Sequence, residues 1–142
     1  MTQVRNGDVR PANVGTIDIL GLRTVGIPVT DSDQALAFYV GVLGLDKRLD
    51  LPIGAGRRWI EVAAPGAQTS IALICARDGL PAGVETGIRL VAADVDATQA
   101  ALAAAGVNVA EVLRWPGVPA MFALRDPDGN GLEIVGPARP GQ

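Results

Sequence analysis

The amino acids that this chain lacks narrow its chemistry first. Its 142 residues include no histidine and a single cysteine, Cys75. The absence of histidine excludes a Ser-His-Asp triad, a histidine general base and any metal site built on imidazole. One cysteine excludes an intramolecular disulfide and a cysteine-rich zinc cluster. What remains is a carboxylate that acts as a base, an arginine that stabilises an anion, and tryptophans that offer surfaces for stacking.

The composition is typical of one folded domain. Of the residues, 49% are hydrophobic and 19% are charged, and the formal net charge is −3. This apolar content excludes an intrinsically disordered chain, and the acidic balance argues against a nucleic-acid partner. The sequence shows neither a secretory signal nor an apolar run long enough to span a membrane. We therefore expect a cytoplasmic protein with no membrane partner.

The chain contains one structural pattern twice. Asp31 precedes an apolar-periodic stretch that stops at Gly44, and Asp94 precedes another that stops at Gly106. Asp caps helix N-termini and Gly ends helices, so the pattern predicts helices over 34–43 and 97–105. Alternating runs flank both helices, one before and three after. The expected strands are 24–29, 45–51, 57–63 and 69–76, then 87–92, 109–114, 118–124 and 131–136.

This order, βαβββ repeated after about 62 residues, predicts an α+β fold. Module 1 covers about residues 17–78 and module 2 about 84–136, within a single domain over 17–136. Residues 1–16 are polar and punctuated by Gly and Pro, so we expect a flexible N-terminal arm there and a tail over 137–142.

Two motifs lie in the first predicted helix and in the last predicted hairpin. The helix carries Phe38-Tyr39-x-x-Val42-Leu43-Gly44, and the hairpin carries Asp126-Pro127-Asp128-Gly129-Asn130-x-x-Glu133. Together with the rest of 20–136 they resemble the vicinal oxygen chelate superfamily, the glyoxalase, bleomycin-resistance and extradiol-dioxygenase group. The resemblance implies tandem βαβββ modules that form a curled mixed sheet with helices on the outside. It also implies a small-molecule cup and usually a homodimer, but no single activity.

Strand alternation predicts the side chains on the open face, because successive residues face opposite sides and the apolar set packs against the helices. The open-face set is Thr24, Trp59, Glu61, Ala72, Gly87, Arg89, Met121 and Glu133. Our candidate ligand-binding residues are Thr24, Trp59, Glu61, Arg89, Trp115, Met121 and Glu133. Glu133 is also the candidate catalytic residue. Alternatively, Arg89 and Glu133 form an ion pair, and the tryptophans cap the core or a dimer seam.

The resemblance also implies where a divalent metal would bind, since metal-dependent relatives hold it with His, Gln or Glu from four strands. In this chain the four positions carry Thr24, Ala72, Gly87 and Glu133. Only Glu133 is a strong ligand, whereas a catalytic site normally takes three or more ligands from the protein. We therefore expect no metal and no other cofactor.

Two functional hypotheses remain, from different classes. The first is a bleomycin-resistance-like protein that binds a small organic molecule in a concave, metal-free cup and sequesters it. The second is an enzyme of the same superfamily, a lyase, isomerase, epimerase or dioxygenase, with Glu133 as the base or as the one retained metal ligand. A glyoxalase proper is not expected, because its chemistry needs the metal. The expected partners are the small molecule and a second copy of the chain.

Overall fold

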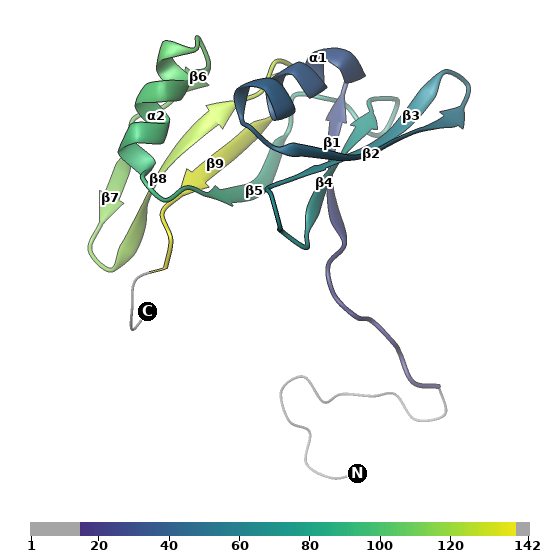
Figure 1. Ribbon diagram of the computed structural model, residues 1–142, viewed down its shortest axis with the longest axis horizontal. Coiled ribbons are helices and arrows are strands. Elements are labelled where there is room, and N and C mark those ends of the chain that lie inside the picture. The colour runs from purple at the N-terminus through teal and green to yellow at the C-terminus, as the bar shows by residue number, and fades with distance from the viewer. Residues whose placement is uncertain (1–14, 139–142) are drawn as a thin grey trace.

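The computed structural model describes residues 15–138. Two mixed β-sheets lie side by side, and the helices of both modules lie on the same side of them (Figure 1). Residues 1–14 of the arm expected over 1–16 lie outside the described residues, as do residues 139–142 of the tail expected over 137–142. None of the described helices is long and apolar enough to cross a membrane.

Module 1 folds into a helical segment and a four-stranded sheet. Its elements are β1 (Thr24–Val29), α1 (Ser32–Leu36), the π-helical η1 (Ala37–Val42), β2 (Asp46–Gly54), β3 (Arg57–Ala63) and β4 (Ser70–Cys75). The Asp31 carboxylate caps α1 by accepting hydrogen bonds from the amides of Asp33 and Gln34. The helical segment ends before Gly44, whose φ of +78° is a conformation that glycine adopts without strain. The strand order is β1-β4-β3-β2, with β1 parallel to β4.

Module 2 repeats this plan with one additional strand. Its elements are β5 (Glu85–Val91), α2 (Val95–Ala104), β6 (Asn108–Val109), β7 (Leu113–Trp115), β8 (Val118–Arg125) and β9 (Gly131–Val135). Asp94 caps α2 by accepting a hydrogen bond from the amide of Ala97. The strand order is β5-β9-β8-β6, and β7 also pairs with β8. The predicted α+β fold of two tandem modules is therefore confirmed, with one mixed sheet in each module.

Two elements differ in kind from the sequence prediction, and the bounds of several others differ by a few residues. The helix expected over 34–43 begins at Ser32 and continues as the π-helical turn, in which the consecutive side chains of Phe38 and Tyr39 are both buried. A π-helical turn holds an extra residue, which helps to bring both rings onto the buried side. The strand expected over 109–114 is divided into β6 and β7, because residues 110–112 between them belong to no strand.

A single apolar core joins the two modules. Alternate strand residues supply most of it, as the alternation predicts, and the helices cover it. Its most deeply buried members are Ile27, Val29, Tyr39, Ile60, Val62, Leu73, Phe122 and Leu124. The strand residues that alternate with these core residues face the other way and do not join the core. Arg89 on β5 and Glu133 on β9 are therefore accessible.

A buried polar network at the Asp126–Asn130 turn ties the modules together. The Tyr39 hydroxyl donates to Asp126 at 2.7 Å, and burial together with this bond raises the pKa of the Tyr39 phenol. Asn130 is fully buried and donates to the carbonyl oxygen of Pro28 at 2.8 Å. Its side-chain oxygen accepts the amides of Gly83 and Val84 at 2.8 and 3.0 Å. The turn therefore joins the end of β1, the helical segment and the start of β5.

We expect Asn130→Ala to destabilise the fold by about 2–4 kcal/mol, because two backbone amides and one carbonyl lose their buried partner. Urea unfolding followed by circular dichroism measures this loss. Asn108→Ala, at an exposed position, is the matched control and is expected to stay within about 0.5 kcal/mol of the parent protein. Equal effects at the two positions would contradict the role given to the network.

Candidate functional site

The first group of predicted site residues surrounds Glu61 on β3. The Glu61 side chain is only 6% exposed, and it accepts hydrogen bonds from the Trp59 indole at 2.8 Å and the Ser70 hydroxyl at 2.9 Å. Arg23 lies 3.4 Å away and completes the set. The Trp59 bond is the largest of the influences that hold the pKa of this carboxyl below its ordinary value, followed by Ser70 and Arg23 against the opposing effect of burial. The Glu61 carboxylate is therefore held in place, in its ionised form, by hydrogen bonds within the protein.

Thr24 is linked to the same group through Ser70. Its hydroxyl donates to the carbonyl oxygen of Ser70 at 3.2 Å. A polar pocket of about 200 Å³ opens beside these residues, lined by Arg23, Arg48, Leu49, Glu61, Gln68 and Ser70. The polar atoms of Thr24, Trp59 and Glu61 are thus largely used in bonds within the protein, which favours a structural role over ligand contact.

The second group surrounds Glu133 on β9. Arg89 lies opposite Glu133 in the parallel β5–β9 ladder, and its Nε contacts Glu133 Oε1 at 2.9 Å. This is the ion pair that the sequence left open as an alternative. The two side chains are 59% and 34% exposed, so water screens their attraction and the pair contributes about 0–1 kcal/mol. A ligand group could therefore replace either partner of this ion pair at a small cost in free energy.

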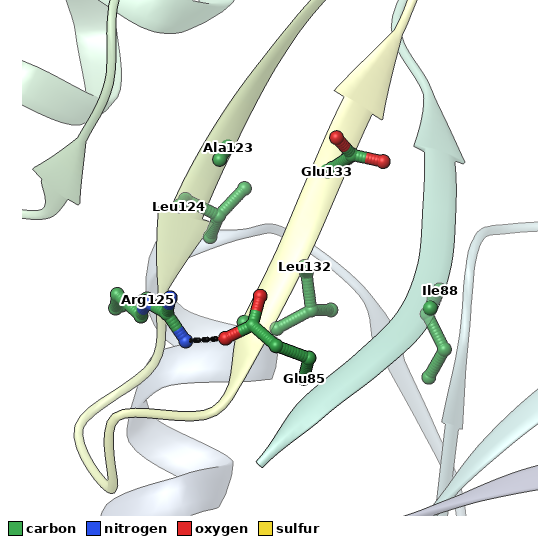
Figure 2. A pocket seen from close by; sticks show the side chains of 9 residues that line it. Glu85, Ile88, Ala123, Leu124, Arg125, Leu132 and Glu133 are labelled. Carbon is green, nitrogen blue, oxygen red and sulfur yellow. Dashed lines mark hydrogen bonds and ion pairs between the residues drawn. The ribbon is translucent and has the colours of Figure 1, made fainter. Parts of the chain in front are cut away.

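A pocket of about 190 Å³ lies next to Glu133 (Figure 2). Figure 2 shows Glu85 and Glu133 on neighbouring strands, with Arg125 reaching from β8 to form an ion pair with Glu85. Gly87 and Ala123 also line the pocket, and their small size keeps it open. Glu85 and Arg125 were not predicted as site residues, because each lies just beyond the end of an expected strand. Continuing the alternation of β5 by one step would have placed Glu85 with Gly87 and Arg89.

Met121 and Trp115 extend this second group along the sheet. Ala123 lies opposite Glu133 and Met121 opposite Val135 in the β8–β9 ladder, so Met121, Ala123 and Glu133 share one face. Met121 is half-buried, whereas Trp115 at the end of β7 is 50% exposed. Met121 therefore offers apolar surface on the face that carries Glu133, and Trp115 lies farther along β8, opposite Val118.

The structure thus separates the predicted site residues into two groups. Thr24, Trp59 and Glu61 lie on the sheet of module 1, and the remaining four, Arg89, Trp115, Met121 and Glu133, lie on the sheet of module 2. Glu61 and Glu133 line different pockets. Alternation along β3 and β9 kept Glu61 and Glu133 apart from the core residues on either side of them. It carried no information on distances between strands of different sheets.

The side chains at the four positions where the resemblance implies a divalent metal do not form a suitable set of ligands. Of the four positions, Ala72 and Gly87 have no donor atom, and the Thr24 hydroxyl is bonded to Ser70. Glu133 is engaged by Arg89. Within residues 15–138, no three His, Cys, Asp or Glu side chains come together as a metal site would require. No catalytic step through a metal is therefore derived from this arrangement.

Comparison with known proteins agrees with the fold. The model of the Glyoxalase/Bleomycin resistance protein/Dioxygenase superfamily matches residues 21–134, so the chain belongs to this superfamily. A comparison with curated proteins gives no match.

Several solved structures are similar. TnmS3, an antibiotic binding protein from Streptomyces sp. CB03234, is 34% identical with a TM-score of 0.77, over 87% of this chain and 100% of that protein. A superfamily member from Sphaerobacter thermophilus is 33% identical with a TM-score of 0.78, over 84% and 98%. A glyoxalase/bleomycin resistance protein from Streptomyces sp. CB03234 is 35% identical with a TM-score of 0.71, over 81% and 99%.

We expect Glu61→Gln to lower stability by roughly 1.5–3 kcal/mol at pH 7, because hydrogen bonds to a charged acceptor are lost. The folded-state pKa of Glu61 is lowered, so the ionised carboxylate stabilises the fold above its unfolded pKa, and this contribution is lost as the pH falls through the folded pKa. The difference between parent and variant should therefore shrink below about pH 4. Urea midpoints between pH 7 and pH 3 measure it, with the exposed Glu111→Gln as control. A difference independent of pH would contradict this assignment.

Proposed function

We propose that this protein binds a small organic molecule in a metal-free cup that includes the surface around Glu133, and sequesters it. The observation that carries the proposal is the Arg89–Glu133 ion pair. It occupies the one strong donor among the four metal positions, yet it is exposed enough for a ligand to exchange with either partner. The open surface beside it supplies the few polar groups and the apolar area that ligand recognition requires.

The ligand would contact this surface in two ways. Its polar or charged group would lie in the pocket beside Glu85 and Glu133, where Arg125 and Arg89 balance the two carboxylates. Its apolar part would lie along Met121 and Trp115. The likeness to TnmS3, which is described as an antibiotic binding protein, supports binding over catalysis and suggests an antibiotic as the kind of molecule.

We also propose that two copies of the chain form a homodimer. β1 and β5 are each the edge strand of a sheet, with one side of their backbone unpaired by any described strand. Uncovered edges of this length favour pairing with another chain. The cytoplasmic location expected from the sequence stays a prediction.

The first test is the metal content of the protein. Protein purified without a nickel-affinity step is expected to contain far less than one Mn, Fe, Co, Ni or Zn per chain, because the superfamily's metal positions do not supply three ligands. Elemental analysis by mass spectrometry measures the content before and after dialysis against zinc. One tightly held metal ion per chain would contradict the metal-free cup and favour the enzymatic alternative.

The second test uses the two tryptophans, Trp59 and Trp115, as separate fluorescent reporters. Bleomycin and a panel of planar aromatic antibiotics serve as probes. We expect saturable quenching by a member of this set that persists in Trp59→Phe and is lost in Trp115→Phe. Glu133→Gln should weaken binding by roughly ten- to a hundredfold, the effect of losing a hydrogen bond to a charged group.

Glu111→Gln is the matched control and should bind as the parent does, because Glu111 is exposed and lies outside the residues that line the pocket. Quenching carried by Trp59 alone, or equal affinity of Glu133→Gln and Glu111→Gln, would argue against the proposed site. Chemical conversion of a bound probe that Glu133→Gln abolishes while binding persists would establish the enzymatic alternative instead.

A further inference from the structure

Two charged side chains meet across a strand of module 2. β9 lies between β5 and β8, and Gly131 is paired with Glu85 on β5 and with Arg125 on β8. The backbones of Glu85 and Arg125 are therefore two strand spacings apart, roughly 10 Å. The two side chains nevertheless form an ion pair, and Figure 2 shows this pair spanning the width of β9. We call the Glu85–Arg125 pair the cross-strand bridge.

The absence of a side chain at Gly131 makes room for the cross-strand bridge. A Cβ atom at this position would lie 2.6 Å from Oε1 of Glu85 and 2.7 Å from a terminal guanidinium nitrogen of Arg125. Both distances are well below ordinary van der Waals contact. Any other amino acid at position 131 would therefore push the bridge away from β9.

The cross-strand bridge and the Arg89–Glu133 ion pair occupy successive rows of the sheet. Glu133 follows Gly131 by two residues on β9, so both positions face the same side. The pocket beside Glu133 lies between the two rows, because Glu85, Arg125, Gly131 and Glu133 all line it. The bridge is therefore one boundary of this pocket, on the side of the Asp126–Asn130 turn.

The pocket beside Glu133 is small. Its volume of about 190 Å³ is below the roughly 300–1,000 Å³ of sites that enclose a whole drug-sized molecule. It adjoins a larger groove of about 560 Å³ between the two sheets, because Gly87 and Ile88 line both. The pocket itself therefore has room for one substituent of a ligand, with the rest of the molecule outside it.

The charges around the pocket balance one to one. Arg125 neutralises Glu85, and Arg89 neutralises Glu133. A charged ligand group therefore meets little net attraction, and pairing with it would take one side chain from its present partner. The paired side chains still have hydrogen-bonding capacity, since a carboxylate has about four acceptor sites and a guanidinium has five N–H donors. A neutral group that both donates and accepts hydrogen bonds can use this capacity while both ion pairs stay intact.

We propose that the pocket beside Glu133 binds a neutral substituent that donates and accepts hydrogen bonds, of which a carboxamide is the simplest, and that the cross-strand bridge sets this preference. The N–H groups of the carboxamide would donate to Glu85 and Glu133, and its oxygen would accept from Arg125. Gly131 is a positioning residue, since it acts only through the bridge. The inference rests on the proposed binding function and names the chemical class of the group that this pocket takes.

The first experiment compares three probes of similar shape and different charge: benzamide, benzoate and benzamidine, which is a cation at pH 7. The shifts of the backbone amide NMR signals of Gly131, Leu132 and Glu133 measure binding at the pocket. The parent is expected to bind benzamide about fivefold more tightly than either charged probe. Arg125→Gln leaves Glu85 without its partner and should make benzamidine the preferred probe, whereas Glu85→Gln should make benzoate the preferred probe. Each change should shift the ratio of affinities by roughly tenfold, the effect of a hydrogen bond to a charged group.

Both substitutions affect accessible side chains, 74% exposed for Glu85 and 41% for Arg125, so these variants should fold as the parent does. Arg114→Gln is the matched control, because it also removes an exposed ion pair, with Asp96, and Arg114 does not line the pocket. It should keep the parent's order of the three probes. An order that neither Glu85→Gln nor Arg125→Gln changes would overturn the proposal, as would a parent that prefers a charged probe or binds none of the three.

Failure of this inference can be told from failure of the proposed function. Saturable binding of an antibiotic at the Glu133 surface, together with an unchanged order of the three probes, would overturn the carboxamide preference and keep the binding function. The absence of both would overturn both.

The second experiment tests the role of Gly131. In Gly131→Ala the new methyl group should displace only the ends of two flexible side chains, so thermal unfolding should be unchanged. The NMR signals of the Arg125 guanidinium should move in the direction in which Glu85→Gln moves them, and the affinity for benzamide should fall by roughly three- to tenfold. Gly41→Ala is the control, because a Cβ atom there meets nothing within 4 Å, and it should change neither quantity. Guanidinium signals that respond to Glu85→Gln but not to Gly131→Ala would overturn the role given to Gly131.

Discussion

The arrangement of the whole molecule depends on the turn Asp126–Asn130, whose first and last residues are buried. One oxygen of Asp126 accepts the amides of Asp128 and Asn130, while the other accepts the Tyr39 hydroxyl and the Asn130 side-chain amide. These bonds lie in the core, where an unpaired carboxylate or amide is costly, so the whole set is retained or lost together. By holding the ends of both edge strands, the turn fixes where β1 and β5 lie relative to each other.

Within this arrangement, the carboxylates of Glu61 and Glu133 differ in how easily a ligand can reach them. Glu61 is buried, bonded through both oxygens and held ionised, so a ligand would have to displace several internal bonds to reach it. Glu133 has one arginine partner and remains accessible. The cost of exchanging partners is therefore much lower at Glu133, and recognition of a small molecule is more favourable on the second sheet.

The same constraint leaves the edges of β1 and β5 beside a groove that they do not close by pairing with each other. Gly87 and Ile88 of β5 line both this groove and the pocket beside Glu133, so the two surfaces adjoin each other.

The sequence by itself determined the superfamily, the two βαβββ modules and the inward or outward side of most strand residues. Capping aspartates, terminating glycines and a two-residue period are local signals, and Phe122, Leu124 and Glu133 follow them. Only the tertiary structure decided that Tyr39 bonds to Asp126, that Trp59 and Ser70 enclose Glu61, and that Glu85 and Arg125 join Glu133 at one pocket. Those contacts join residues from different elements, whose separation is set by core packing and strand register, and neither is encoded in the periodicity of a single strand.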